Sequence, residues 1–272
     1  MVETTITALS EPCITGTGEY RCWKYYIFFY FVSVHWCSTT KMTTIVTHMV
    51  GRPGDRVMTF CAEKCNCTQV TSMTLDAIGH GEKRLEYSWV HDYRWGKYKQ
   101  NNPPPSIDAI RRAKASGTVC LKFVRDPVDR FSSIYKRYTK IGIRGAPSGL
   151  SVDGFLDWLS TKNLVRYMLG SYTHDEHITS QRFHNETDDL WTDIIHVETF
   201  RDPEVRKRIH TFYGLVVDPE WTSDHWIPEP VHLTDEQRAR VLCIYHMDAR
   251  YVLPIRKQEG ETCDGQGASD RE

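Results

Sequence analysis

Leu121-Lys-Phe-Val-Arg-Asp-Pro-Val-Asp-Arg-Phe-Ser-Ser-Ile-Tyr135 is a segment in which a strand turns directly into a helix. The strand is predicted over 118–124, where β-branched and apolar residues predominate. The helix is predicted to begin after Asp126, which can cap it, with Pro127 at the first position, where the missing N–H costs nothing. Arg125 therefore lies where the carboxyl end of a strand meets a helix N-terminus.

This strand–helix junction is suited to binding an anion. Ligands of open α/β sheets bind at the carboxyl ends of the strands, and helix N-termini attract anions. On the predicted helix, Arg130, Ser133 and Arg137 share one face at spacings of three and four residues. A strand-end arginine and a hydroxyl on the following helix suit a phosphate. The alternative is an ordinary capped helix whose arginines pair with the neighbouring aspartates.

The same residues resemble the 3′-phosphate-binding segment of the Golgi-type carbohydrate sulfotransferases, the sulfotransferase family that includes the chondroitin- and HNK-type enzymes. All fixed positions of Arg-Asp-Pro-x-x-Arg-x-x-Ser-x-Tyr are present. In that family the first arginine and the serine hold the 3′-phosphate of the sulfate donor, 3′-phosphoadenosine 5′-phosphosulfate (PAPS). The resemblance assigns this role to Arg125 and Ser133. It also implies a P-loop-like three-layer α/β/α fold with a mostly parallel central sheet.

A PAPS site needs a second cradle for the 5′-phosphosulfate, and the loop after the first predicted strand, 25–34, is the expected place. Hydroxyls and successive N–H groups at a helix start can surround an oxyanion. This loop resembles the family's Pro-Lys-x-x-(Ser/Cys)-Thr motif, with histidine in the lysine position; an ordinary helix cap is the alternative. The residues expected to contact the donor are His35, Ser38, Thr39, Thr40 and Lys41.

Three later segments resemble the family in order and spacing, so that the resemblance extends from the first predicted strand almost to the tail. Asp175-Glu-His-Ile-Thr-Ser-Gln181 matches Asp-x-His-Trp-x-Pro-Gln at its Asp, His and Gln positions. The segment 193–200 resembles a strand that ends at an acidic residue, here Glu198. Ile244-Tyr-His-Met-Asp248 resembles the closing Tyr-x-x-Asp helix.

Sulfuryl transfer also requires a base for the acceptor hydroxyl. His177 is the first candidate by resemblance, although a histidine bonded within a loop is an equally good interpretation. His91 is the second, because some uronyl-type relatives place a base histidine before the 3′-phosphate segment. His35 can donate a hydrogen bond or a proton. Glu198 is expected to be structural, bonding a loop or a basic residue.

Composition indicates an ordinary globular protein. The chain has 272 residues, a net charge of −1 and 40% hydrophobic residues. Its overall charge therefore does not favour binding to nucleic acid or to an anionic membrane. No segment is predicted to span a membrane, because the apolar run 25–34 is far shorter than the roughly 20 residues required. That run is also a poor signal peptide. The resemblance implies the Golgi lumen or membrane, although no anchor is evident.

Nine cysteines are many for this length, and three of them cluster at Cys61, Cys65 and Cys67. Disulfides and free thiols are both compatible with the spacing, whereas zinc lacks a fourth ligand at a recognised spacing. Asn66-Cys-Thr and Asn185-Glu-Thr are glycosylation sequons, which favour a secretory lumen and a glycoprotein.

Strands that alternate with helices favour a mostly parallel sheet covered on both faces. We predict three regions along the chain: a loose leader (1–20), a sulfotransferase domain (21–256) and a disordered tail (257–272). Within the domain, 55–102 resists assignment. The helices are predicted over Met42–Val50, after Ser106, over Phe155–Met168, after Asp202-Pro203, and after Thr234, which forms a capping box with Gln237.

The sequence thus predicts an enzyme that transfers a sulfuryl group from PAPS to a carbohydrate hydroxyl, without a metal. One alternative is a non-catalytic relative that binds PAPS or its product, suggested by His35 in the lysine position. A P-loop nucleotide kinase is disfavoured, because no Gly-x-x-x-x-Gly-Lys-(Ser/Thr) follows the first predicted strand. The acceptor sugar and the oligomeric state stay open.

Overall fold

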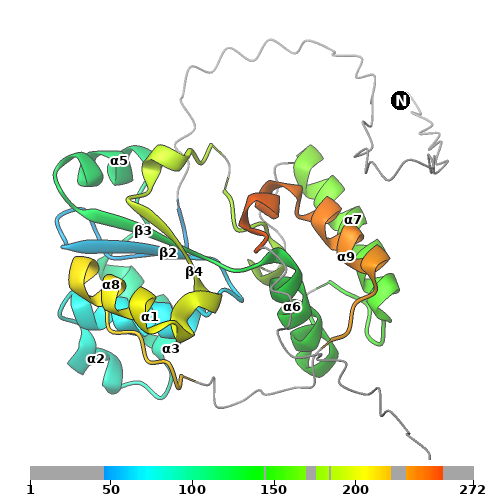
Figure 1. Cartoon of the computed structure of the whole chain (residues 1–272), viewed down its shortest axis with the longest axis horizontal. Helices are drawn as coiled ribbons and strands as arrows, with labels where there is room; N and C mark the ends of the chain where they lie inside the picture. Colours follow the sequence, from blue (N-terminus) through cyan, green and yellow to red (C-terminus); the bar gives the residue numbers. More distant parts are fainter. Residues whose placement is uncertain (1–45, 144, 170–175, 184, 222–230, 254–272) are drawn as a thin grey trace, which may run out of the picture. The chain divides into compact units, whose positions relative to one another are not determined.

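Four strands form one open sheet in the order β1-β2-β3-β4. The computed structural model describes residues 46–143, 145–169, 176–183, 185–221 and 231–253, and Figure 1 shows their arrangement. β1 (Met49–Val50) runs antiparallel to β2 (Val57–Cys61), whereas β2, β3 (Val119–Val124) and β4 (Asp193–His196) are mutually parallel. The predicted α/β class with a mostly parallel sheet is therefore confirmed.

The register of the parallel strands brings two strand ends together. Cys61, the last residue of β2, lies opposite Phe123, and Val124 at the end of β3 lies opposite His196. β2 is buried along its whole length and β3 along nearly all of it, as expected for strands covered on both faces. The loops that leave β2 and β3 consequently start side by side at the carboxyl edge of the sheet.

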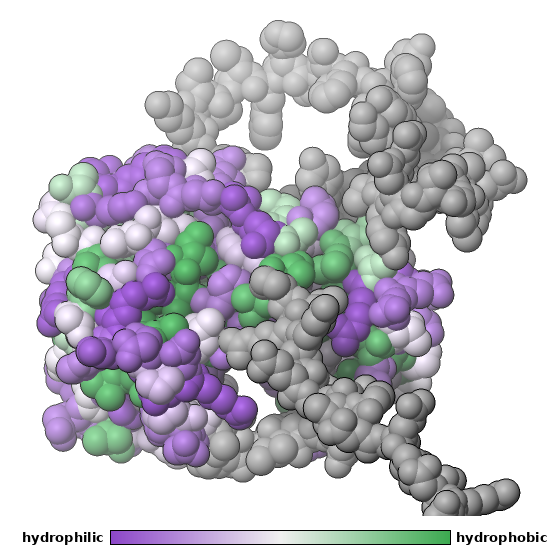
Figure 2. Space-filling model, viewed as in Figure 1, coloured by the Kyte–Doolittle hydropathy of each residue, from purple (hydrophilic) through white to green (hydrophobic). Residues whose placement is uncertain are grey.

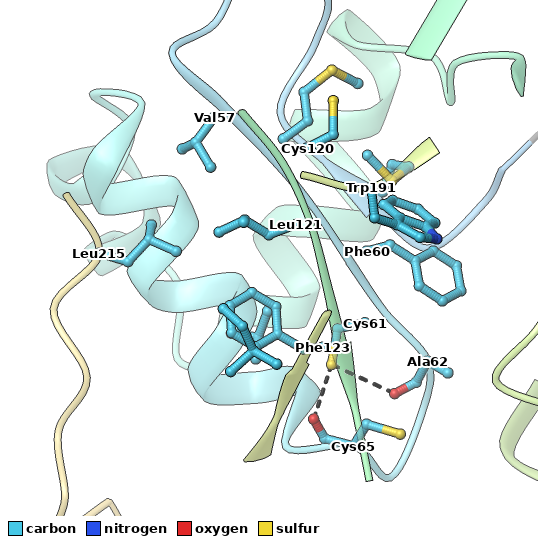
Figure 3. Close-up of a cluster of buried hydrophobic side chains, with 14 of the residues drawn as sticks. Val57, Phe60, Cys61, Ala62, Cys65, Cys120, Leu121, Phe123, Trp191 and Leu215 are labelled. Carbon is cyan, nitrogen blue, oxygen red and sulfur yellow. Dashed lines mark hydrogen bonds between the residues drawn. The ribbon is translucent and has the colours of Figure 1, made fainter. Parts of the chain in front are cut away.

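Helices cover both faces of the sheet. α5 (Ile107–Ala115) lies on one face, and α1 (Cys67–Ala77) and α8 (Pro203–Tyr213) lie on the other (Figure 1). Figure 3 shows Leu121 and Phe123 on the side of α1, and Cys120 and Trp191 on the opposite side of β3. This alternation along the strand gives each helix layer its own part of the hydrophobic core.

A second hydrophobic cluster joins three helices that follow the sheet. α6 (Pro127–Ile141), α7 (Val152–Leu169) and α9 (Asp235–Ile244) pack around fully buried Phe131, Phe155 and Val241. The rings of Tyr138 and Phe155 stack with centroids 4.5 Å apart. α6 therefore links the edge of the sheet to this cluster.

Residues 55–102, for which the sequence predicts no secondary structure, contain β2 and most of the short helices. α2 (Gly81–Leu85), α3 (Val90–Tyr93), a π-helix η1 (Arg94–Tyr98) and α4 (Lys99–Asn101) follow α1 in succession. Four 3₁₀ turns complete the described elements: η2 (Glu176–Ile178), η3 (Asp188–Leu190), η4 (Val197–Arg201) and η5 (His246–Tyr251).

The predicted helix starts are confirmed by their caps. The Asp126 side chain accepts hydrogen bonds from the N–H groups of Val128 and Asp129, and Pro127 follows it. The capping box of Thr234 and Gln237 is also present. The remaining predicted caps, Ser106 and Asp202, begin α5 and α8.

The predicted helix Met42–Val50 is wrong where the structure describes it. Met49 and Val50 pair instead with Phe60 and Thr59 of β2, because an apolar, β-branched edge segment gains ladder hydrogen bonds and burial there. The predicted leader, tail and strand 25–34 lie outside the described residues.

The described surface is mainly hydrophilic, with small separate hydrophobic groups on the face drawn in Figure 2. Within the described ranges, no helix has both the length and the apolar character needed to cross a membrane.

Candidate functional site

The candidate site lies where β2 and β3 end and α1 and α6 begin. Arg125, the first residue after β3, is held from both sides of its backbone by Gln181. The Gln181 Oε1 accepts from the Arg125 N–H at 2.7 Å, and its Nε2 donates to the Arg125 carbonyl at 2.7 Å. The Arg125 guanidinium reaches the Lys64 carbonyl at 3.3 Å and lies 3.9 Å from Glu198. Its backbone is thus fixed while its side chain crosses to the neighbouring loop.

Two carboxylates support this junction, one partly buried and one fully buried. Glu198 accepts the Asp126 N–H at 2.8 Å, which is the structural role expected from sequence, and burial raises its pKa. Asp248 is fully buried and accepts from the backbone N–H of Gln181 at 2.9 Å. The three later segments that resemble the family therefore converge on Arg125 and Asp126, although they are far apart in sequence.

The loop between β2 and α1 has an unusual backbone. Lys64 and Asn66 both have positive φ, at 67° and 58°, although neither is glycine. Asn66 is the N-cap residue of α1, yet its side chain makes no capping hydrogen bond. Left-handed residues before a helix start turn successive N–H groups toward one side, and such concave arrangements bind anions. The loop has the backbone geometry of an oxyanion cradle.

Three cationic side chains gather beside this loop. Burial, Arg137 and Arg125 lower the pKa of Lys64, so its ammonium lies within electrostatic range of both guanidinium groups. The Arg137 Nε is buried and has no hydrogen-bond partner in the described part of the chain. Ser133 lies one turn before Arg137 on α6 and is half-buried. Positive charges that repel one another in this way are stabilised by an anion placed among them.

Arg130 belongs to the core rather than to this cationic group. Its side chain is buried, with Nε donating to the Glu63 carbonyl at 2.9 Å and Nη2 to the His177 carbonyl at 3.3 Å. The alternative arrangement, in which Arg125 and Arg130 pair with the neighbouring aspartates, is therefore not the one observed. Arg130 instead ties the β2–α1 loop to the segment that contains His177.

The carboxylate of Glu63 is the centre of a buried polar cluster. It accepts from the Cys67 thiol at 3.1 Å and lies 3.9 Å from both His48 and His177. Burial opposes its ionisation, but the positive charge of Arg94, electrostatic coupling to His48 and the thiol hydrogen bond prevail and lower its pKa to about 2. Glu63 is therefore ionised at neutral pH.

Both histidines predicted as candidate bases lie next to this cluster. His91 is almost completely buried, with Nε2 3.2 Å from the Thr68 hydroxyl and 3.6 Å from the Cys67 thiol. Burial and the charge of Arg94 lower its pKa to about 4. The His177 side chain, by contrast, is 22% exposed. Of the two, His177 is the one that a bound molecule can reach without a rearrangement.

The predicted phosphosulfate loop lies outside the described residues, with its five named positions His35, Ser38, Thr39, Thr40 and Lys41. The described loop contains candidates that sequence reasoning missed. Lys64-Cys-Asn-Cys67-Thr68 has the Lys-x-x-(Ser/Cys)-Thr spacing of the family's 5′ motif, with Glu63 in the proline position. The spacing of this motif is visible in the sequence, but the strand before it carries no clear local signal.

The thiols of the cysteine cluster are free and act as hydrogen-bond donors. Cys61 donates to the Cys65 carbonyl at 2.9 Å (Figure 3), and Cys65 donates to Gln181 at 3.0 Å. Burial raises the pKa of Cys65 to about 12, which keeps its thiol protonated. Within the described ranges, no group of His, Cys, Asp or Glu side chains is arranged to hold a metal ion.

The two sequons differ in accessibility. The Asn66 amide donates to Gln69 at 2.5 Å and Cys67 is buried, so this sequon is part of the folded loop. Asn185 is exposed. Only the second sequon has the surface position that glycosylation requires.

No protein-family model matches the chain, and no curated protein or solved structure does so either.

Proposed function

We propose that this protein is a PAPS-dependent sulfotransferase that acts on a carbohydrate hydroxyl, with a P-loop-like three-layer α/β/α fold. The observation that carries the proposal is the placement of Lys64 and Arg125 at two adjacent strand–helix junctions, with Arg137 of α6 within electrostatic range of Lys64. Ser133 lies one turn before Arg137 on the same helix. PAPS has a phosphate at its 3′ end and a phosphosulfate at its 5′ end. Two neighbouring anion cradles, one after each strand, match this chemistry.

The 3′-phosphate is assigned to the junction of β3 and α6. Arg125 has a fixed backbone and a partly exposed guanidinium, which can hold a phosphate through two parallel hydrogen bonds. Ser133 offers a hydroxyl two turns into α6, and Arg137 offers the Nε that lacks a partner among the described residues. The N-terminus of α6 adds a favourable dipole.

The 5′-phosphosulfate is assigned to the loop 62–68, which takes the place of the predicted loop 35–41 in this proposal. It follows β2, the strand next to β3, so the two cradles are neighbours. Lys64 supplies the ammonium, and the first N–H groups of α1 and the Thr68 hydroxyl supply donors. In this proposal Lys64 is the lysine of the 5′ motif. The histidine at position 35 is then no longer a reason to infer a non-catalytic relative.

The reaction is a direct sulfuryl transfer. The acceptor oxygen attacks sulfur while the bond from sulfur to the bridging phosphate oxygen breaks, giving a sulfate ester and 3′-phosphoadenosine 5′-phosphate. Negative charge develops on the leaving phosphate, where Lys64 and the helix dipole stabilise it. The acceptor proton passes to His177, which the Glu63 carboxylate orients from 3.9 Å. His91 is too buried for direct contact and is assigned a supporting position.

The acceptor and the compartment follow from the same proposal. A carbohydrate acceptor and the Golgi lumen are what the resemblance implies, and the exposed Asn185 sequon is compatible with a secretory lumen. No metal is assigned a role in this chemistry.

Calorimetry with 3′-phosphoadenosine 5′-phosphate tests the donor site. We expect this compound to bind more tightly than AMP, which lacks the 3′-phosphate. Arg125→Ala should weaken binding by about 1.5–3 kcal/mol, the usual worth of a charged hydrogen bond. Arg112→Ala is the matched control, because Arg112 is exposed on α5. Equal affinity for the two nucleotides, or an unaffected Arg125→Ala, would refute the donor assignment.

A transfer assay tests the enzymatic part separately. Labelled sulfate from PAPS is offered with a panel of glycans of different charge and linkage. Donor-product binding without transfer to any member of the panel would favour the non-catalytic alternative. ATP binding without a preference for the 3′-phosphate would favour a nucleotide kinase.

A further inference from the structure

A buried arginine lies behind the carboxylate that orients the proposed base. Arg94, the first residue of η1, is only 1% exposed, and its Nη1 makes a long hydrogen bond of 3.5 Å to the Thr71 hydroxyl of α1. Its Nε and Nη2 are buried and have no hydrogen-bond partner among the described residues. A buried guanidinium with so few contacts is costly unless a negative charge lies near it.

Arg94 packs on the helix that carries the thiol donor of Glu63. Thr71 lies one turn after Cys67 on α1, and the Cys67 thiol donates to the Glu63 carboxylate at 3.1 Å. His91 lies three residues before Arg94 and reaches the same first turn of α1, with Nε2 3.6 Å from the Cys67 thiol. The segment formed by α3 and η1 therefore packs against the turns of α1 that face Glu63.

The Trp95 ring covers this region on the outside. It lies 4.7 Å from the Arg94 guanidinium and 6.1 Å from the ring of His48 in edge-to-face geometry. His48 is in turn 3.9 Å from Glu63, and Trp95 is 38% exposed. Consecutive residues of the π-helix η1 thus place a charge inside and its aromatic cover outside. π-helical turns are rare and occur frequently at functional sites.

Glu63 is the group that balances the charge of Arg94. Burial and Arg94 lower the pKa of His48 to about 3 and that of His91 to about 4, so both rings are neutral at neutral pH. Arg94 is the strongest influence that keeps Glu63 ionised against the effect of burial. Within the described ranges, the ion pairs of Glu63 are with His48 and His177 and not with Arg94. The two charges therefore act on each other across a low-dielectric interior.

The other buried arginine of this region has a different task. Arg130 donates from Nε to the Glu63 carbonyl and from Nη2 to the His177 carbonyl. It fixes the backbones of Glu63 and His177 but makes no bond to the Glu63 carboxylate. The charge of that carboxylate is left to Arg94.

We propose that Arg94 is a positioning residue of the sulfuryl transfer, which keeps the Glu63 carboxylate in the place from which it orients His177. This inference rests on the proposed function, in which His177 receives the acceptor proton. Arg94 is too buried to touch donor or acceptor, so its effect passes through Glu63. Its loss should therefore lower kcat and leave the KM for PAPS unchanged.

A cycle of variants in the transfer assay tests the proposal. Arg94→Met and Glu63→Gln should each lower kcat about tenfold, and the double variant should be no slower than either one, because both changes remove the same interaction. Arg94→Lys keeps the charge and should recover most of the loss. Arg112→Met, on the exposed side of α5, is the matched control. Losses that multiply in the double variant, or an Arg94→Lys variant as slow as Arg94→Met, would overturn the proposal.

Urea unfolding measures the same coupling without PAPS. Glu63→Gln should lower the unfolding midpoint of the wild type, where it leaves Arg94 unbalanced. It should raise the midpoint of Arg94→Met, where it removes an unbalanced buried carboxylate. If Arg94→Met does not fold, the double variant should. Additive midpoints, or failure of both variants to fold, would overturn the proposal.

The ring signals of His177 report its orientation directly. Nitrogen-15 NMR of the histidine rings is recorded at pH 8, where His48 and His91 are neutral in each protein. Arg94→Met and Glu63→Gln should change the His177 signals in the same way. Wild-type His177 signals in Arg94→Met would show that Arg94 does not act on the base.

These outcomes are separable from the proposed function. Coupling of Arg94 with Glu63, but no sulfate transfer to any acceptor, would refute the sulfotransferase proposal and with it the catalytic role of Arg94. Sulfate transfer without that coupling would refute the role of Arg94 alone.

Discussion

The side chain of Gln181 is paired with the backbone of Arg125 in both directions, with two hydrogen bonds of 2.7 Å. Gln181 is fully buried and also accepts the Cys65 thiol at 3.0 Å. One amide therefore connects the end of β3, the loop after β2 and the segment that contains His177. The positions of Arg125 and of the loop that carries Lys64 therefore depend on this side chain.

Gln181→Leu should lower the free energy of unfolding by roughly 2–4 kcal/mol, because it leaves the partly buried N–H and carbonyl of Arg125 without their Gln181 partners. Urea unfolding followed by circular dichroism measures this change. Gln100→Leu, at an exposed position, is the matched control and should have little effect. An unaffected midpoint in Gln181→Leu would mean that these two bonds are replaced by water.

Lys64→Ala should weaken donor-product binding without lowering the free energy of unfolding. In the free protein, Lys64 is partly buried and is repelled by Arg137 and Arg125, so its removal should leave the free energy of unfolding unchanged or slightly raised. Affinity for 3′-phosphoadenosine 5′-phosphate should nevertheless fall about tenfold or more. Lys207→Ala controls for the loss of one positive charge. Reduced stability with unchanged affinity would remove Lys64 from the proposed donor site.

Much of the fold could be predicted from local signals. β3 and α6 are marked by an apolar strand, an aspartate cap and a proline at the first helical position, and the structure has all three. α1 gave no such signal. Its N-cap, Asn66, is left-handed and makes no side-chain cap, and its buried residues include polar Gln69 and Thr74 as well as apolar ones. Without a cap or an apolar stripe, neither its start nor its face could be recognised.

The candidate site was predictable at β3 and much less so at β2. Arg125 and Ser133 follow from a motif whose strand and helix are both evident in the sequence. The lysine motif at Lys64 has the same spacing as the family motif, but its preceding strand was not recognised. Glu63 could not be predicted, because its importance comes from His48, His177 and Cys67, which only the tertiary fold brings to it.

Acidification should destabilise the protein through its buried histidines. Burial and nearby cations lower the pKa of His91 to about 4 and of His48 to about 3, from an ordinary value of 6.5. The unfolded chain then binds protons below pH 6.5 that the folded chain does not. Stability is fully present above pH 6.5 and is lost as the pH falls toward these lowered values.

His91→Gln isolates one of these groups. Between pH 6.5 and 4.5 the wild type should lose roughly 2 kcal/mol more stability than this variant, because one proton-linked group has been removed. Glu63 contributes little in this window, because its stabilising effect is lost mainly below pH 4.5, as the pH falls toward its lowered pKa. His232→Gln, at an exposed histidine, should retain the wild-type slope. Parallel slopes for wild type and His91→Gln would show that His91 is not held neutral.

His177→Ala tests the assignment of the base. We expect sulfate transfer to fall about 100-fold or more, the usual contribution of a general base, while affinity for 3′-phosphoadenosine 5′-phosphate changes little. Glu63→Gln should reduce transfer less, because it keeps the side chain but removes the negative charge facing His177. His246→Ala, at an exposed histidine of η5, is the control.

The comparison with His91→Gln decides between the two histidines. If His177 is the base, His91→Gln should retain most of the transfer activity, since His91 is buried and reaches only Thr68 and Cys67. The opposite pattern, with activity lost in His91→Gln and kept in His177→Ala, would require the loop 62–68 to open during the reaction. The acceptor would then approach from the side of α3 instead of the side of η2.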